Sequence, residues 1–177
     1  MYPLIRFAHA ILSNRSAPRL GVTDTHVSHH LCWPWDIDPW LELNNGRILT
    51  LYDLGRMGAG ARIGLVEALR KRRWGLAVAG CSVRYRKRIT AFQQIEMRTR
   101  CAGWDSRFIY VVQSMWVKGT CCSQALLRTA VTSSDGTVPP STVMAELGWT
   151  EVGPEMPDWV TAWIEAESTR PWPPERD

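Results

Sequence analysis

The sequence predicts an α+β fold in which an antiparallel β-sheet wraps around a long central helix. Two observations support this prediction. An apolar segment that starts near residues 44–45 and is apolar on nearly all sides predicts a buried helix. Residues 75–133 then divide into segments with short connections, which are typical of consecutive strands. A buried helix must be covered over its apolar surface, so we expect the strands to enclose it.

The composition is that of a globular protein of ordinary domain size. Its 177 residues can form one core, so we expect a single domain over residues 1–177. The core is expected at about residues 23–133, with helical extensions at both ends. With 45% hydrophobic and 21% charged residues, and no apolar run near the ~20 residues of a membrane span, we expect no integral membrane association.

The amino-terminal segment lacks the basic start, continuous apolar stretch and cleavage site of a secretion signal. Its apolar residues recur at helical spacing, at Leu4, Ile5, Ala8, Ile11 and Leu12. The spacing predicts a helix that packs on the domain through these residues, and a helix on a membrane surface is the alternative.

The cysteines and histidines do not predict a metal site. Five cysteines are an odd number without paired ligand spacing, so we expect reduced thiols in a cytoplasmic protein. Three of the four histidines fall on one predicted strand, where His29 would face away from His26 and His30. No HExxH arrangement is present.

The predicted elements begin with a strand over residues 23–35. Asn44 or Asn45 can cap the central helix that follows. Gly55, Gly58 and Gly60 weaken helix propensity, which indicates either close approach by another element or an end to the helix. We predict a break there and a second, shorter helix over residues 61–72.

Four strands are predicted next, over residues 75–89, 93–101, 108–119 and 123–133. In the second of them apolar and charged residues alternate, as expected for a sheet with one buried face. The short connections predict an antiparallel meander, to which the first strand adds at an edge or between the others. Two short helices, at residues 141–148 and 158–167, and a disordered proline-rich end, residues 170–177, complete the chain.

The net charge of +4 is concentrated in two basic clusters, at residues 70–73 and 84–88. Such clusters suit an anionic ligand, and a solvated surface is the alternative. Nucleic acid is not expected as a partner, because the ten tryptophans are not interleaved with the basic runs. On a strand, Arg84, Arg86 and Arg88 would share one face.

The segment WDIDPWLELNNGR carries a resemblance to a known family. Together with the element order and the later segments YDLGR, VRYRKR and GWDSRFIY, it resembles the hotdog-fold acyl-CoA thioesterases of the 4-hydroxybenzoyl-CoA thioesterase type. The similarity is strongest to the thioesterase-like branch related to thioesterase superfamily member six, over residues 23–133. Glu42 stands where the family often has histidine, and Ile48 where it often has tyrosine.

The chemistry of these residues suits thioester hydrolysis. Asp38 can act as a general base or as a nucleophile, and a role in the turn is the alternative. Unpaired N–H groups at a helix start can hold an oxyanion, which the resemblance assigns near Asn45; the Asn44 and Asn45 side chains can instead cap the helix. Asp36 is expected in a turn or a surface salt bridge. Asp53, expected to pair with Arg56, is the alternative catalytic carboxylate.

The resemblance implies hydrolysis of acyl-CoA, with coenzyme A as part of the substrate and no separate cofactor. Cations would contact the coenzyme A phosphates, and the candidates are Arg84, Arg86, Lys87 and Arg88. Because related proteins bind ligand between protomers, a homodimer or homotetramer is implied. A non-catalytic acyl-CoA or fatty-acyl binding protein is the alternative. A hydratase of this fold is disfavoured, since no histidine follows Trp33.

Overall fold

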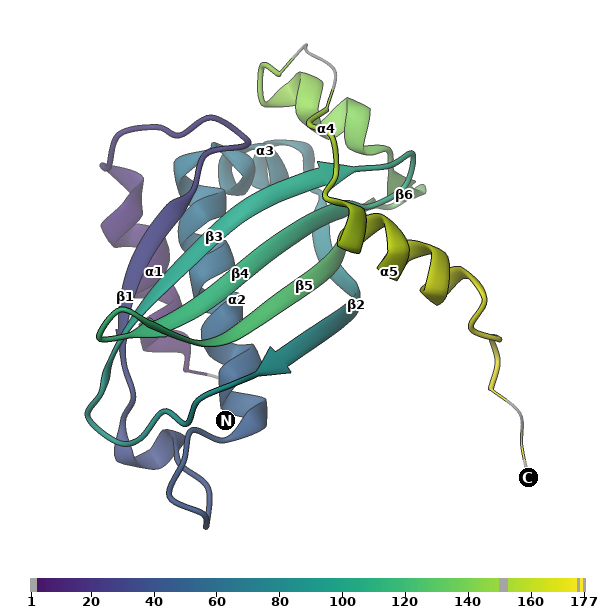
Figure 1. Ribbon diagram of the computed structural model, residues 1–177. Helices are drawn as coiled ribbons and strands as arrows, with labels where there is room; N and C mark the ends of the chain where they lie inside the picture. Colours follow the sequence, from purple (N-terminus) through teal and green to yellow (C-terminus); the bar gives the residue numbers. More distant parts are fainter. Residues whose placement is uncertain (1–2, 150–152, 175, 177) are drawn as a thin grey trace.

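A curled antiparallel sheet encloses one long helix, as predicted (Figure 1). The computed structural model describes residues 3–149, 153–174 and 176. The six strands are β1 (His26–Leu31), β2 (Gly75–Tyr85), β3 (Gln94–Trp104), β4 (Ile109–Val117), β5 (Thr120–Ser133) and β6 (Gly136–Val138). The helices are α1 (Leu4–Arg15), α2 (Asn45–Arg62), α3 (Leu65–Arg72), α4 (Pro140–Glu146) and α5 (Asp158–Ser168), with a 3-10 turn, η1, at Pro34–Asp36.

The strand order is β1-β3-β4-β5-β2, with β6 paired to β5. The predicted four-strand meander is therefore wrong at its first member, because β2 pairs with β5 and not with β3. The pairing runs from Gly75 opposite Thr132 to Tyr85 opposite Ser123. This order lets the sheet curl around α2 and leaves β1 and β2 as its two edges. Of the two positions left open for β1, at an edge or between the other strands, the structure has the edge, where β1 pairs with β3.

The central helix continues through its glycines, so the predicted break is wrong. Gly55, Gly58 and Gly60 all lie inside α2, which ends at Arg62. The other interpretation of these glycines, close approach, holds at two positions. A methyl group on Gly55 would overlap the sulfur of Met97 on β3, and one on Gly58 would lie 2.8 Å from Nε2 of His26 on β1. The helix ends where Gly64 adopts a positive φ of 85°.

The core lies between α2 and the inner face of the sheet. Its largest side chains are fully buried and include Tyr52, Leu51, Leu54, Met97 and Met115. Strand residues of the opposite parity, such as Tyr110, Val112 and Leu126, pack with Val160 of α5. Thus α5 covers part of the outer face of the sheet, while α2 fills the inner one.

The terminal helices form where they were predicted, but α1 uses another face. It packs against α2, with Ala10 buried and Phe7 against the core. Leu4, Ile5 and Leu12 are 70%, 87% and 64% exposed, so the predicted apolar contact face is wrong. Among the described helices, none is both long and apolar enough to cross a membrane. The predicted disorder of residues 170–177 falls partly on residues 175 and 177, which lie outside the described residues.

Candidate functional site

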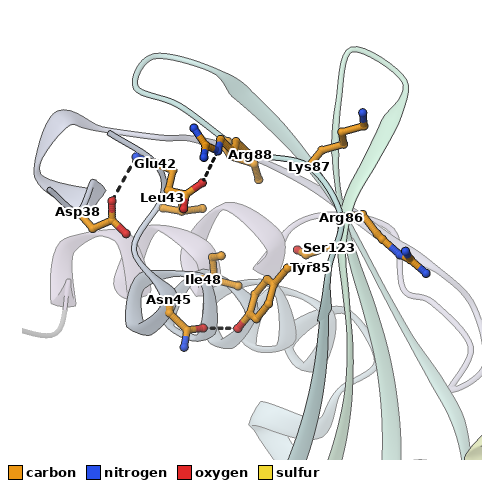
Figure 2. Close-up of a pocket in the computed structure, with 11 residues that line it drawn as sticks. Asp38, Glu42, Leu43, Asn45, Ile48, Tyr85, Arg86, Lys87, Arg88 and Ser123 are labelled. Carbon is orange, nitrogen blue, oxygen red and sulfur yellow. Dashed lines mark hydrogen bonds and ion pairs between the residues drawn. The ribbon is translucent and has the colours of Figure 1, made fainter. Parts of the chain in front are cut away.

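A pocket of about 360 Å³ opens where the chain leaves β1, turns, and enters α2. Figure 2 shows the side chains that line it. They come from the loop before α2, from the first turn of α2, from the end of β2 with the segment after it, and from β5. The lining residues are Asp38, Glu42, Leu43, Asn45, Ile48, Tyr85, Arg86, Lys87, Arg88, Ile89 and Ser123.

Asp38 organises the loop before α2. Its Oδ1 accepts hydrogen bonds from the backbone N–H groups of Trp40 at 2.9 Å and Glu42 at 3.3 Å. The backbone of Asp38 also bonds to Glu42 and Leu41, at 2.9 and 3.0 Å. The turn role considered for this residue is therefore present. Because both side-chain bonds use Oδ1, the half-buried carboxylate still lines the pocket.

Asn44 caps α2, which confirms the predicted helix start. Its Oδ1 accepts from the N–H groups of Gly46 and Arg47, at 2.9 and 3.3 Å. These bonds use two of the amides of the first helical turn. The Asn44 side chain does not bond to the N–H of Asn45, the first residue of the helix. Asn45, and not Asn44, lines the pocket.

Tyr85 links the edge of the sheet to the start of α2. Its hydroxyl donates a hydrogen bond to Oδ1 of Asn45 (Figure 2). Burial raises the pKa of Tyr85, which keeps the phenol protonated and able to donate. Sequence reasoning missed this residue. The available signal was the position of Tyr85 as the one aromatic residue inside the basic run RYRKR.

Ser123 was missed as well, because a lone serine on a strand gives no functional signal. Its Oγ lies 2.8 Å from the hydroxyl of Tyr52, and burial strongly raises the pKa of that phenol. Tyr52 is fully buried in α2. The pair therefore gives the floor of the pocket a neutral, hydrogen-bonded polar contact between α2 and β5.

The second basic cluster divides at the end of β2. Arg86, Lys87 and Arg88 line the pocket, whereas Arg84 lies in a separate groove beside Trp159. The predicted single row of arginines is wrong, because β2 ends at Tyr85 and strand alternation ends with it. The N–H groups of Arg86 and Lys87 both turn toward the carbonyl of Cys122, at 2.8 and 3.2 Å.

Glu42 faces this basic segment. Its Oε2 lies 3.1 Å from Nε of Arg88, whose side chain is 75% exposed. The neighbouring Leu43 N–H donates to the carbonyl of Ile89 at 2.8 Å. The loop that carries Asp38 and the segment that carries the cations are thus held side by side, which places carboxylates and cations around one opening.

Comparison with known proteins assigns this chain to a family. The family model of the thioesterase-like superfamily matches residues 32–164. The chain belongs to the thioesterase-like superfamily. Among its relatives, Protein THEM6 of Drosophila melanogaster is 32% identical over 149 residues, which cover 82% of this chain and 75% of that protein.

Solved structures confirm the hotdog fold of this thioesterase-like protein. DHNA-CoA thioesterase of Staphylococcus aureus aligns with a TM-score of 0.62 and 13% identity, over 81% of this chain and 91% of that one. The protein SAV2348 of Staphylococcus aureus, solved in complex with CoA, aligns with a TM-score of 0.61 and 9% identity, over 80% and 95% of the two chains.

Asp53 lies outside the pocket of the thioesterase-like chain. Its Oδ1 is 2.9 Å from Nη2 of Arg56, which confirms the predicted pair. Nη1 of Arg56 donates to Oε1 of Gln113 at 2.8 Å, and Gln113 is fully buried. Asp53 is eight residues beyond Asn45, or about 12 Å along α2. Asp38, in the loop before α2, and Asp53, within α2, therefore lie in different places, and Asp38 is the one that lines the pocket.

Asp36 stabilises the loop before α2 through buried hydrogen bonds and ion pairs. It is 2% exposed and its Oδ2 accepts from Nη1 of Arg6 at 2.8 Å and from the Trp33 N–H at 3.2 Å. Nε of Arg47 lies 3.7 Å from Oδ1. The expected surface salt bridge is thus a buried one, since α1 covers it. It ties α1 to the first turn of α2 and positions the loop between them.

Three of the four histidines of this thioesterase-like chain, His26, His29 and His30, lie on β1, away from the pocket. His29 is exposed while His26 is buried, in line with the predicted alternation. Among residues 3–149, 153–174 and 176, no three histidine, cysteine, aspartate or glutamate side chains form a group that could hold a metal ion.

Proposed function

We propose that this protein hydrolyses acyl-CoA thioesters to the free acid and coenzyme A. The observation that carries the proposal is that Asp38, the Asn45 end of α2 and three cations all line one pocket. Membership of the thioesterase-like superfamily and the fold shared with DHNA-CoA thioesterase support thioester hydrolysis as the reaction class.

In this mechanism Asp38 takes a proton from a water molecule, whose oxygen attacks the thioester carbonyl carbon. The N–H of Asn45, at the positive end of the α2 dipole, stabilises the oxyanion of the tetrahedral intermediate; one such donor typically contributes about 3 kcal/mol. The intermediate collapses with cleavage of the C–S bond. The coenzyme A sulfur leaves as a thiolate and takes the proton held by Asp38.

A direct attack by Asp38 is the other route. It forms a mixed anhydride and releases the thiolate, and water then hydrolyses the anhydride. In both routes the free oxygen of Asp38, Oδ2, reacts while Oδ1 keeps the loop in place. Glu42 would act on Arg88, holding the cation beside the coenzyme A phosphates together with Arg86 and Lys87.

The test is release of free thiol from a panel of acyl-CoAs of different chain length and aromatic content. We expect Asp38→Asn to lower kcat at least about a hundredfold, because the substitution removes the base but keeps the Oδ1 acceptor of the turn. Glu42→Gln should mainly raise KM. Asp53→Asn is the matched control. Loss of turnover in Asp53→Asn with activity retained in Asp38→Asn would contradict the role of Asp38.

A second candidate function is acyl-CoA binding without hydrolysis. It is favoured by the bonds that engage Asp38 and Glu42 in the loop and by the apolar Ile48, which offers no proton. Calorimetric binding of acyl-CoA with no thiol release from any member of the panel would identify it.

We also infer a homodimer formed through the edge strand β2. This strand is eleven residues long, and both of its faces are largely exposed, with Leu76, Val78 and Tyr85 at 38%, 50% and 47%. A long, exposed apolar edge is a template for pairing with a second strand. Pairing there would bring the pockets of the two protomers near one interface, since Tyr85 lies at the end of β2 and also lines the pocket.

Sedimentation analysis tests this interface. Val78→Lys places a charge at the centre of the edge and should convert the dimer to monomer. Val27→Lys, on the opposite edge strand β1 and 41% exposed, is the matched control and should leave the dimer intact. A monomeric unsubstituted protein, or dissociation by the Val27 change alone, would refute the inference.

A further inference from the structure

Large apolar side chains gather at the end of the molecule where α2 begins. They belong to the loop after β1 and the segment after β2, at the lower end of Figure 1. Trp40 is 74% exposed, Leu41 75%, Phe92 66% and Trp35 64%. We call these four residues the aromatic end. A group of large exposed apolar residues is a mark of an interaction site, whereas scattered single ones are ordinary.

The two segments form one surface. The N–H of Cys32 donates to the carbonyl of Gln93 at 3.0 Å, and the N–H of Phe92 donates back to the carbonyl of Cys32 at 2.7 Å. The bond from Leu43 to Ile89 joins the same segments at their other flank. The aromatic end is therefore held by backbone pairing on both sides.

The backbone presents these side chains in an uncommon conformation. Within the described part of the chain, four non-glycine residues have positive φ, and two belong to the aromatic end: Leu41 at 61° and Phe92 at 62°. A third, Lys118 at 49°, lies in the two-residue turn between β4 and β5, where positive φ is usual. Phe92 and Lys118 line one shallow groove. A left-handed conformation is unfavourable for such residues, and unfavourable backbone conformations concentrate at functional positions.

The exposed tryptophans are also pre-ordered. The rings of Trp33 and Trp35 stack with centroids 4.9 Å apart and an interplanar angle of 6°. Asp38 accepts from the N–H of Trp40, which fixes the turn that carries Trp40 and Leu41. An ordered apolar surface loses little entropy when it is covered.

The charges around the aromatic end favour an anionic partner. Arg86, Lys87 and Lys118 are exposed there. Of the nearby acids, Glu42 is paired with Arg88 and Asp36 is buried against Arg6, which leaves the half-buried Asp38 against three exposed cations. Tryptophan is the residue enriched at membrane–water interfaces, and exposed basic residues are attracted to anionic lipid headgroups.

We propose that the aromatic end docks on the surface of an anionic phospholipid membrane. Trp35, Trp40, Leu41 and Phe92 enter the headgroup region, and Lys118 contacts the headgroups. The start of α1 extends the same surface, because Ile5, 87% exposed, lines one groove with Trp33. The candidate pocket opens at this end, so a ligand with an acyl chain reaches it directly from the lipid.

Co-sedimentation with vesicles tests the proposal without any thioester present, so its outcome is independent of hydrolysis. We expect the full chain to sediment with vesicles of phosphatidylcholine and phosphatidylserine, and less with phosphatidylcholine alone. Trp35→Ser combined with Trp40→Ser should lower the partition coefficient about tenfold or more. Lys118→Glu should weaken binding to the anionic vesicles and leave binding to phosphatidylcholine unchanged.

The matched control removes two exposed tryptophans elsewhere, Trp159→Ser with Trp172→Ser, which are 44% and 90% exposed. This variant should sediment like the unsubstituted protein. No sedimentation with either vesicle, or an equal loss in the control, would overturn the proposal. So would a Trp35 and Trp40 variant that still binds vesicles but loses its oligomeric state, since the aromatic end would then be a protein interface.

Discussion

At the scale of single residues, the carboxylates of the loop before α2 divide their tasks by burial. Asp36 is buried and held by Arg6, so it stabilises the loop. Asp38, two residues later, is half-buried and uses Oδ1 alone for the turn. A motif of two aspartates thus contains one structural residue and one residue open to the pocket, because Asp36 ends the 3-10 turn η1 and bonds to Arg6 of α1, whereas Asp38 begins the next turn, which leads to α2.

Tyr85 provides the sharpest test at this scale. Tyr85→Phe removes the donor to Oδ1 of Asn45 and frees the Asn45 side chain to rotate over the helix start. We expect kcat for acyl-CoA hydrolysis to fall about fivefold, with a smaller change in KM, since one positioning hydrogen bond is worth about 1 kcal/mol.

The control for this prediction is Tyr110→Phe, which removes a hydroxyl bonded to Asp105, outside the pocket. It should leave kcat unchanged. A Tyr85→Phe variant with unchanged kcat would show that the bond to Asn45 has no part in the reaction.

At the scale of elements, α2 combines a cap at one end with close packing along its length. Asn44 defines where the helix starts, and the glycines define how near the sheet can come. Gly55 faces the fully buried side chains of Met97 and Gln113. At Gly60, about one and a half turns further along α2, an added methyl group would lie 3.6 Å from Cγ2 of Val66, which is an ordinary van der Waals contact.

This difference predicts opposite effects of the same substitution. Gly55→Ala should lower the free energy of unfolding by about 1–3 kcal/mol, because the methyl group overpacks the core. Gly60→Ala should raise it by about 0.5–1 kcal/mol through better helix propensity. Urea unfolding monitored by circular dichroism measures both. Equal destabilisation by the two changes would contradict the packing at Gly55.

At the scale of the whole molecule, buried histidines connect stability to pH. Burial, with a smaller effect of the Arg62 charge, lowers the pKa of His26 from 6.5 to about 4. Burial and the nearby Arg6 lower the pKa of His30 to about 4 as well. The unfolded chain binds protons at these residues below pH 6.5, and the folded chain does not until about pH 4.

We therefore expect stability to be fully present above pH 6.5 and to fall between pH 6.5 and 4. His26 alone would contribute roughly 3 kcal/mol to this loss. Urea unfolding at a series of pH values measures it, and His26→Gln should flatten the pH dependence by that amount. A flat profile in the unsubstituted protein would show that His26 is protonated normally in the fold.

The sequence by itself determined the features that depend on neighbouring residues. The Asn44 cap of α2, the alternation in β3, the positions of α4 and α5 and the α+β class with an enclosed helix follow from caps, periodicity and short connections. The hotdog fold itself was implied by the resemblance carried by the motif WDIDPWLELNNGR. Asp38 and Asn45 were also selected from one short motif, and they line the same pocket.

Only the tertiary structure decided what depends on pairing between distant segments. The bond from Tyr85 to Asn45 joins residues forty positions apart, and it exists because β2 pairs with β5 at the sheet edge and meets the start of α2 there. The separation of Arg84 from Arg86, the close approach at Gly55 and the inward face of α1 have the same origin. Local patterns specify which segments are helix or strand, whereas the closure of the sheet around α2 specifies which side chains meet.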